Sequence, residues 1–282
     1  GLGQPVAVTS GSAPAGVRRA AVLGSPISHS LSPALHRAAY AALGLDWSYD
    51  AIEVGADALP GFVAGMDRTW AGLSLTMPLK QAIMPLLADV DPLAARLRSV
   101  NTVLPVGDGS WRGLNTDVEG VVRALRQAGL ADQARTATVL GAGATARSAV
   151  AALAELRVGA VVVCARRPEA AAEVAALAAD LGIPATRTAP LTATSALLAA
   201  DVVVSTLPGS AGAPWAEAAA GARGVLLDAA YHPWPTPLAA AWPTVAVASG
   251  RDMLLWQAVR QVELMTGRPA PVAAMAAALR AA

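Results

Sequence analysis

Short apolar segments alternate with longer amphipathic ones along most of the chain. Apolar blocks bounded by glycine, proline or polar residues predict buried strands, and they lie at 20–23, 47–54, 72–76, 99–105, 137–140, 160–164, 202–205, 225–228 and 244–247. Apolar residues at helical spacing predict helices over 33–43, 59–66, 81–87, 118–127, 145–156, 169–181, 253–264 and 271–280. Strands separated by helix-length segments predict an α/β fold, with a doubly wound parallel sheet in the regular stretch after Asp117.

Two serines stand just before the first predicted helix. Ser32 and Pro33 fit the N-cap and the first helical position, and Gly44 follows the predicted end. The hydroxyls of Ser30 and Ser32, together with free backbone N–H groups and the positive end of the helix dipole, favour a carboxylate as ligand. Simple N-capping also accounts for Ser32, but it leaves Ser30 unexplained.

Composition narrows the class of protein. The chain has 282 residues, of which 55% are hydrophobic and 15% charged, which excludes a disordered or collagen-like protein. A net charge of +1 predicts no nucleic-acid or membrane-surface partner. The longest uncharged run, Ala229–Gly250, contains four prolines and is therefore a poor membrane span. The single cysteine, Cys164, allows no internal disulfide, so we expect an intracellular, cytoplasmic protein without a metal site.

Lys80 is the only lysine among 21 basic residues, since every other one is arginine. A lysine that remains in such a composition indicates a position that needs a compact ammonium able to change its protonation state, which a guanidinium cannot do. The alternative is an ordinary exposed lysine. Composition by itself leaves both interpretations open.

A glycine-rich loop connects the strand predicted at 137–140 to the helix predicted at 145–156. Its pattern, G-x-G-x-x-A, stands in the context that a dinucleotide fingerprint requires. Gly141 fits the tight turn, Gly143 the close approach of backbone N–H groups to a pyrophosphate, and Ala146 the packing of helix on sheet. Cofactor contacts are expected from Gly141, Ala142, Gly143, Ala144 and Ala146. A tight turn without a ligand is the alternative.

Two arginines end the next predicted strand. An NAD site usually has an acidic residue there to accept from the ribose hydroxyls, whereas this chain has Arg166 and Arg167. Guanidinium groups bind a 2′-phosphate through charge-assisted bidentate bonds, so the pair favours NADP over NAD. Alternatively, both arginines face solvent at a helix start.

Taken in order, the polar motifs of the chain resemble those of the shikimate dehydrogenase family over nearly its whole length after about Val17. The matching segments are Gly24–Pro26 with Ser30–Pro33, Thr76–Lys80, Val100–Thr102, Asn115–Asp117, Gly141–Arg147, Ser205–Pro208, Asp228–Pro233 and Met253–Gln257. The resemblance implies reversible, NADPH-dependent reduction of 3-dehydroshikimate to shikimate. It also implies Lys80 and Asp117 as the catalytic pair, because an ammonium beside a carbonyl that accepts hydride stabilises the developing alkoxide and donates the proton.

The resemblance implies the remaining site residues as well. Substrate would contact Ser30, Ser32, Thr76, Lys80, Asn101, Asp117, Tyr231 and Gln257. Cofactor would contact the glycine-rich loop, Arg166, Arg167, Thr206, Gly250 and Met253. Each of these has a structural alternative: Thr116 and Glu119 fit a capping box that would make Asp117 an ordinary first-turn acid, and Tyr231 and Gln257 fit interior polar groups bonded to backbone.

Two domains joined around a cleft are expected. Residues 1–17 are predicted to be a flexible tail, residues 18–116 plus 253–282 the substrate-binding and catalytic α/β domain, and residues 117–252 the NADP-binding, Rossmann-type domain. Because the chain leaves the first domain and returns to it, we expect the cleft to close by a hinge motion. The protein is expected to be a monomer or a homodimer.

Three positions depart from the family pattern. Ser74 stands where the family usually has Asn, Arg167 where Thr is frequent, and Asp252 where a second glycine is common. Asp252 raises a question about cofactor affinity. The alternative functions are quinate or aminoshikimate dehydrogenase, and a non-catalytic sensor that binds shikimate.

Overall fold

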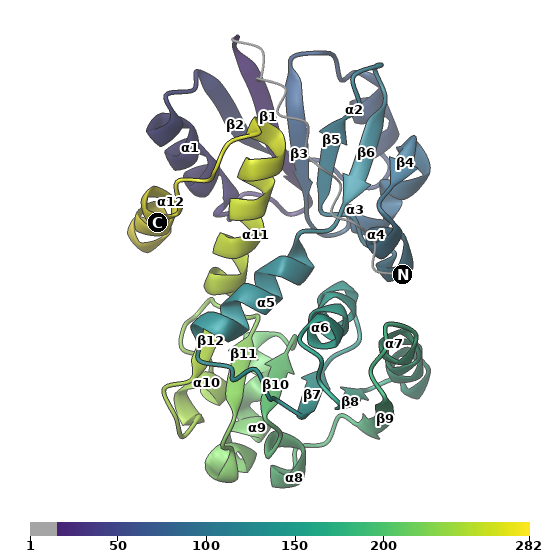
Figure 1. Cartoon of the computed structure of the whole chain (residues 1–282), viewed down its shortest axis with the longest axis vertical. Helices are drawn as coiled ribbons and strands as arrows, with labels where there is room; N and C mark the ends of the chain where they lie inside the picture. Colours follow the sequence, from purple (N-terminus) through teal and green to yellow (C-terminus); the bar gives the residue numbers. More distant parts are fainter. Residues whose placement is uncertain (1–15) are drawn as a thin grey trace.

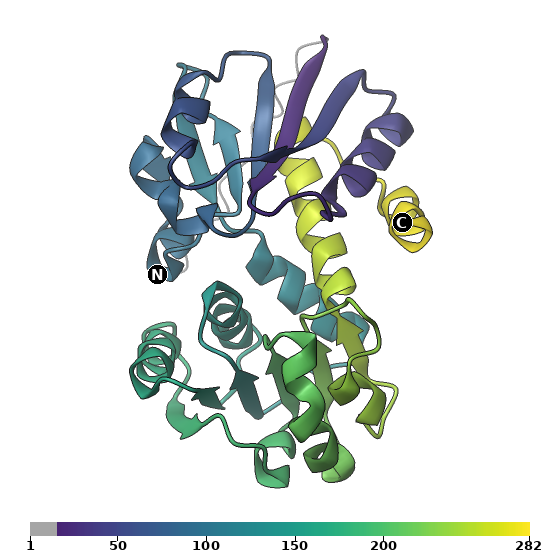
Figure 2. The ribbon, with the colours of Figure 1, turned by 180° about the vertical axis from the view of Figure 1, so that it is seen from behind.

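The computed structural model describes residues 16–282, so the first 15 residues of the predicted tail lie outside the described part. Two α/β domains are stacked along the long axis of the molecule (Figures 1 and 2). Each contains a six-stranded sheet. The predicted two-domain α/β architecture is confirmed.

The first sheet is mixed and has the order β2-β1-β3-β5-β6-β4. Its strands are β1 (Arg18–Gly24), β2 (Trp47–Glu53), β3 (Trp70–Leu75), β4 (Asp89–Val90), β5 (Thr102–Pro105) and β6 (Trp111–Leu114). Strand β1 is parallel to both neighbours, whereas β5 is antiparallel to β3 and β6. The accompanying helices are α1 (Ser32–Leu43), α2 (Leu59–Ala64), α3 (Leu79–Ala82) and α4 (Pro92–Leu97).

The second sheet is parallel throughout and has the order β12-β11-β10-β7-β8-β9. Its strands are β7 (Thr136–Leu140), β8 (Ala160–Ala165), β9 (Ala185–Pro190), β10 (Val202–Ser205), β11 (Val225–Asp228) and β12 (Val247–Ser249). Counted from β7, this is the Rossmann order, and the order reverses between β7 and β10. Ligands of such sheets bind outside the carboxyl ends of the strands at that point.

Helices cover both faces of the second sheet. They are α6 (Ala144–Glu155), α7 (Pro168–Asp180), α8 (Ser195–Leu198), α9 (Ala213–Ala218) and α10 (Pro237–Ala241). Val139, Val163, Val204 and Leu227 are fully buried in the central strands. Near-continuous apolar strands are typical of a sheet covered on both faces, and each such side chain contributes roughly 1.5–3 kcal/mol by burial.

Two helices join the domains. The chain passes into the second domain through α5 (Asp117–Gln127) and returns through α11 (Gly250–Thr266), and the two helices cross between the sheets (Figure 1). The last helix, α12 (Val272–Ala281), packs on α1, where Met275 and Leu279 share a core with Leu35 and Ala39. None of the helices described for residues 16–282 is long and apolar enough to cross a membrane.

The prediction of one helix at 81–87 is wrong, because a proline interrupts it. The structure instead has α3, which ends at Ala82, and a 3₁₀ turn at Met84–Leu86. Pro85 has no N–H to donate and its ring clashes with the preceding turn, so one continuous helix cannot form. The predicted strand at 99–105 is also too long, since β5 begins at Thr102 and Val100 N donates to the backbone oxygen of Lys80 at 2.8 Å.

The predicted boundaries of one strand and one helix are also wrong, and the capping of the helix explains the difference. The strand predicted at 244–247 lies at Val247–Ser249, and the helix predicted at 253–264 already begins at Gly250. A capping box fixes this start: Ser249 N donates to Asp252 Oδ2 at 2.9 Å, and Arg251 N donates to Ser249 Oγ at 3.1 Å. Strands β4, β6 and β9 escaped prediction because they are short or, in β9, largely exposed.

Candidate active site

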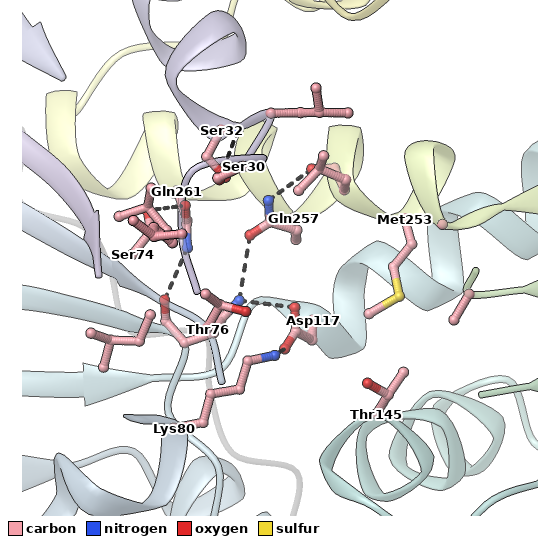
Figure 3. Close-up of a pocket in the computed structure, with 18 of the residues that line it drawn as sticks. Ser30, Ser32, Ser74, Thr76, Lys80, Asp117, Thr145, Met253, Gln257 and Gln261 are labelled. Carbon is pink, nitrogen blue, oxygen red and sulfur yellow. Dashed lines mark hydrogen bonds and ion pairs between the residues drawn. The ribbon is translucent and has the colours of Figure 1, made fainter. Parts of the chain in front are cut away.

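A cavity of about 380 Å³ opens between the domains, and elements of both line it. The eight residues to which the sequence assigns substrate contacts all lie on its wall, together with Gly250 and Met253. These side chains come from the β1–α1 loop, the end of β3, α3, the starts of β5 and α5, the loop after β11, and α11. Figure 3 labels seven of these residues around one space: Ser30, Ser32, Thr76, Lys80, Asp117, Met253 and Gln257.

Lys80 and Asp117 form the charged centre of this wall. Lys80 Nζ donates to Asp117 Oδ2 at 2.6 Å, and the two side chains are 20% and 8% exposed. Limited exposure to water strengthens such an ion pair, because neither the solvent nor salt screens it fully. The turn that carries Lys80 is itself held by the bond from Val100 N to the Lys80 carbonyl.

Asn101 holds the other oxygen of Asp117. Asn101 Nδ2 donates to Asp117 Oδ1 at 3.0 Å, while Asn101 Oδ1 accepts from Thr116 N at 2.7 Å. Because a backbone N–H can only donate, this second bond fixes which end of the amide faces Asp117. The carboxylate therefore has one oxygen for the amide and one for the ammonium.

The capping box suggested for Thr116 and Glu119 does not form. Thr116 occupies the N-cap position of α5 but makes no side-chain cap bond. Instead, Asn115 Oδ1 accepts from the backbone N–H groups of Asp117 and Val118 at 2.8 and 3.3 Å. The Asp117 carboxylate stands in the first turn of α5 and bonds to Lys80 and Asn101.

The Lys80–Asp117 pair is suited to proton transfer at an oxygen. An ammonium held at 2.6 Å from a carboxylate can stabilise negative charge that develops on a nearby oxygen and then donate a proton to it. Because Asn101 and Asp117 are nine-tenths or more buried, these groups are oriented before a ligand arrives.

Ser30 and Ser32 lie at the start of α1 on the same cavity. Ser32 N donates to Ser30 Oγ at 3.3 Å, and Ser32 is buried. The N-cap interpretation of Ser32 is wrong: Ser32 is the first helical residue, and no side-chain cap bond is made there. Its hydroxyl is therefore not used to cap the helix.

Gln257 and Tyr231 also line the cavity; Gln257 is fixed by hydrogen bonds, whereas Tyr231 packs beside a glycine. Gln257 Nε2 donates to Leu254 O at 2.8 Å and Oε1 accepts from Asn101 Nδ2 at 3.4 Å, so this side chain is both bonded to backbone and part of the cavity. Tyr231 lies beside Gly250, where an added Cβ would meet Ala229 O at 2.0 Å. Only glycine fits that position.

The glycine-rich loop lies where the second sheet reverses its order. Gly141 has a φ of +110°, and a Cβ there would lie 2.0 Å from Thr206 Oγ1. Gly143 is the N-cap of α6 with open space around it, and Ala146, in the first turn of α6, is fully buried in the core of the second domain. The loop therefore leaves the N–H groups at the start of α6 accessible to an anion.

Arg166 reaches a second cavity, of about 360 Å³, which Gly141 and Ala142 also line. Arg167 is exposed at the N-cap position of α7 and does not line that cavity. Thr206 lines neither cavity; its hydroxyl donates to Leu140 O at 2.8 Å and packs over Gly141. The structure thus brings Arg166 to the loop but not Arg167.

Sequence reasoning missed several residues on the wall of the first cavity, and two of them, Ser74 and Gln261, are buried polar side chains. Ser74 was noted only as a departure from a family pattern, and Gln261 was not singled out, yet both line the cavity (Figure 3). The available signal was the spacing of Gln257 and Gln261, since residues four apart share one face of a helix.

Comparison with known proteins places these features in a family. The model of the shikimate dehydrogenase substrate binding domain matches residues 22–103, and that of the shikimate 5′-dehydrogenase C-terminal domain matches residues 250–280. The shikimate dehydrogenase (NADP(+)) of Moorella thermoacetica is 38% identical over 273 residues, which cover 93% of this chain and 92% of that protein.

Solved structures agree with the sequence match. The crystal structure of Mycobacterium tuberculosis shikimate dehydrogenase is similar with a TM-score of 0.86 and 47% identity, covering 94% of this chain and 99% of that one. The Thermus thermophilus enzyme in complex with NADP(H) and shikimate is similar with a TM-score of 0.81 and 35% identity, covering 94% and 99%. The chain belongs to the shikimate dehydrogenase family.

Proposed function

We propose that this protein is an NADP-dependent shikimate dehydrogenase, which reversibly reduces 3-dehydroshikimate to shikimate. The observation that carries the proposal is the 2.6 Å pair of Lys80 and Asp117 on the wall of a polar cavity that faces a Rossmann-type domain. The names of the relatives support the reaction, and the Thermus structure with shikimate and NADP(H) supports the substrate and cofactor.

Lys80 would act at the ring carbonyl. When bound, NADPH would supply the hydride for the carbonyl carbon, and the π electron pair of the C=O group would move to its oxygen. Lys80 stabilises the resulting alkoxide and gives its oxygen a proton, and Asp117 keeps the ammonium in place. In the reverse direction, Lys80 takes that proton back as the hydride leaves.

The polar wall would select a polyhydroxylated acid. Ser30 and Ser32 would bind the carboxylate, and Thr76, Asn101, Tyr231 and Gln257 would supply partners to the ring hydroxyls or the carboxylate. A substrate that leaves one of the buried members, Ser32, Asn101 or Gln257, unpaired loses about 1–3 kcal/mol of binding. The wall thus discriminates by hydrogen bonding rather than by size.

The cofactor would lie along the glycine-rich loop. Gly141, Ala142, Gly143 and Ala144 fit a pyrophosphate at the start of α6, where open space surrounds Gly143, and Ala146 supports the loop from below. Arg166 and Arg167 would bind the 2′-phosphate, Arg166 from the wall of the second cavity. Thr206, Gly250 and Met253 would complete the site, the last two from the wall of the substrate cavity.

We further propose the domain division expected from the sequence. Residues 18–116 and 253–282 would bind substrate, and residues 117–252 would bind NADP. The enzyme would act in the cytoplasm as a monomer or a homodimer, on small molecules, without a metal.

Nicotinamide absorbance tests the proposal directly. Purified protein is mixed with each pairing of NADP or NAD with shikimate or quinate. Fast reduction of NADP with shikimate is expected. Reduction with quinate only would favour a quinate dehydrogenase, and shikimate binding without turnover in any pairing would favour a sensor.

The 2′-phosphate assignment has its own test. Arg166→Gln should raise KM for NADP about tenfold or more, since it removes a charge-assisted bond, and should change KM for NAD little. Equal losses with both cofactors would contradict a role at the 2′-phosphate. Arg135→Gln, at an exposed arginine just before the start of β7, serves as the matched control. Arg167→Gln should have a smaller effect than Arg166→Gln, because Arg167 does not line the cavity.

A further inference from the structure

Gln261 lies one helical turn beyond Gln257 and is 1% exposed, yet its side chain reaches the wall of the substrate cavity. We propose that Gln261 is a positioning residue for the reaction: it orders the hydroxyl of Ser74 and ties the strand end that carries Asn101 to α11. This inference deepens the proposed function and rests on it. No family motif noted in the sequence includes Gln261.

The orientation of the Gln261 amide is fixed by its neighbours. Nε2 donates to the backbone oxygen of Asn101 at 3.1 Å and to Thr102 Oγ1 at 2.9 Å. A carbonyl oxygen only accepts, so the NH₂ end must face Asn101 and the oxygen end must face Ser74. Figure 3 shows Gln261 beside Ser74 at the end of the cavity away from Thr145.

This orientation orders the protons of the next two groups. Ser74 Oγ donates to Gln261 Oε1 at 2.7 Å, and Tyr49 OH donates to Ser74 Oγ at 2.7 Å. Both hydroxyl protons are therefore already used, and Ser74 offers the cavity a lone pair. A hydrogen-bond acceptor at this place favours a hydroxyl group of the substrate over a carboxylate oxygen.

His36 supports the same arrangement from behind. Its Nε2 lies 3.2 Å from Gln261 Oε1, and its ring stacks on Tyr49 with centroids 4.1 Å apart. Complete burial lowers the pKa of His36 to about 3, although the bond to Gln261 acts in the opposite direction. The ring is therefore neutral near pH 7 and donates through Nε2 to the Gln261 oxygen.

On its other side, Gln261 acts toward the catalytic pair. Thr102 Oγ1 accepts from Gln261 and donates to Asn101 Oδ1 at 2.9 Å. The same Asn101 amide donates from Nδ2 to Asp117 Oδ1 at 3.0 Å. Without the Gln261 amide, the Asn101 carbonyl and Thr102 each lose a partner, and the amide that holds Asp117 is less firmly placed.

Gln261→Met tests the role with a side chain of similar length and no hydrogen bonds. KM for shikimate should rise about tenfold or more, the effect of losing one or two net hydrogen bonds, with a smaller fall in kcat. KM for NADP should stay near that of the parent, because Gln261 lies in the substrate-binding domain and not in the domain that would bind NADP. The matched control is Gln133→Met, at an exposed glutamine of the second domain.

Gln261→Glu adds a pH readout that a purely structural role would not produce. A protonated carboxyl group can still donate to the Asn101 carbonyl, whereas an ionised one cannot and places a charge beside that oxygen. The titratable groups facing position 261 are His36, Tyr49 through Ser74, and Asp117 through Asn101. The ratio of kcat/KM between variant and parent should therefore fall as the pH rises.

The following outcomes decide the inference. A parent-like KM for shikimate in Gln261→Met, or a flat pH ratio in Gln261→Glu, would overturn it. If Gln261→Met does not fold, Ser74→Ala is tested instead. It should raise KM for shikimate, and its effect should not add to that of Gln261→Glu when the two changes are combined. If the parent neither binds nor turns over shikimate, the proposed function fails first, and this inference fails with it.

Discussion

The two sheets contribute different groups to the cleft: the first contributes side chains and the second contributes main chain. The first sheet presents buried side chains, Ser74 from β3 and Thr102 from β5, with Asn101 just before it. The second sheet presents main chain at Gly141 and Gly143. We therefore expect the first domain's part of the site to be most sensitive to replacing a side chain. The second domain's part should be most sensitive to adding a side chain at a glycine.

Burial explains why the first end needs a network. Ser74, Asn101, Thr102 and Gln261 are buried polar groups, and each is satisfied by another. An unpaired buried group costs about 1–3 kcal/mol, so the members depend on one another. In the second sheet the central strands are mostly apolar, and the parallel ladder already satisfies the backbone.

The largest effect is expected from Lys80→Ala, which breaks the first end at its charge. Removing a general acid that also stabilises an alkoxide should lower kcat about a thousandfold, with a much smaller change in KM. Steady-state kinetics with shikimate and NADP measure it. An unchanged kcat would remove Lys80 from the chemistry, and thermal unfolding separates this loss from misfolding.

Gly141→Ala breaks the second end by adding a methyl group. The new Cβ would lie 2.0 Å from Thr206 Oγ1 at a φ of +110°. The strain is about 3 kcal/mol, which corresponds to roughly a hundredfold loss of NADP affinity if the loop shifts to relieve it. Fluorescence titration with NADPH measures this loss. Gly182→Ala is the matched control, since Gly182 also has a positive φ but open space around it.

The pH dependence of the free energy of unfolding tests the buried network of the first domain, to which the imidazole of His36 belongs. Its pKa is about 3 in the folded protein against 6.5 ordinarily. The unfolded chain takes up the proton first, so this contribution is complete above 6.5 and is lost as the pH falls toward 3. The free energy of unfolding should drop by about 2 kcal/mol between about pH 7 and pH 5 from this group.

Urea unfolding of the parent and of His36→Gln measures this contribution. The variant should lack the His36 share of the drop, and values near pH 8 give the intrinsic cost of the substitution, because the imidazole is then neutral in both states. An identical slope in both proteins would show that His36 does not titrate in the unfolding transition.

The smallest effect is expected at Asp252, where the chain departs from its family. Its carboxylate accepts from Ser249 N at 2.9 Å and so closes the capping box of α11. Asp252→Ala should lower the free energy of unfolding by about 1 kcal/mol, with KM for NADP close to that of the parent. Asp132→Ala, at an exposed acid, is the control. A large rise in KM would instead place the Asp252 carboxylate at the cofactor.

By itself the sequence determined the α/β class, most helices and strands, and the polar residues that the structure gathers on one cavity. These follow from local signals: apolar periodicity, glycine at a turn that needs a positive φ, and a single lysine in an arginine-rich chain. Pro85, present in the sequence, also divides the helix expected at 81–87, a local signal that was overlooked.

Only the tertiary structure decided how those residues share their hydrogen bonds. Asn115 rather than Thr116 caps α5, and Asp117 pairs with Lys80. Gln261, 187 positions from Ser74, reaches its hydroxyl. Such pairings depend on how α11 packs between the two sheets, and no local propensity carries that information because the partners meet only when the chain has folded.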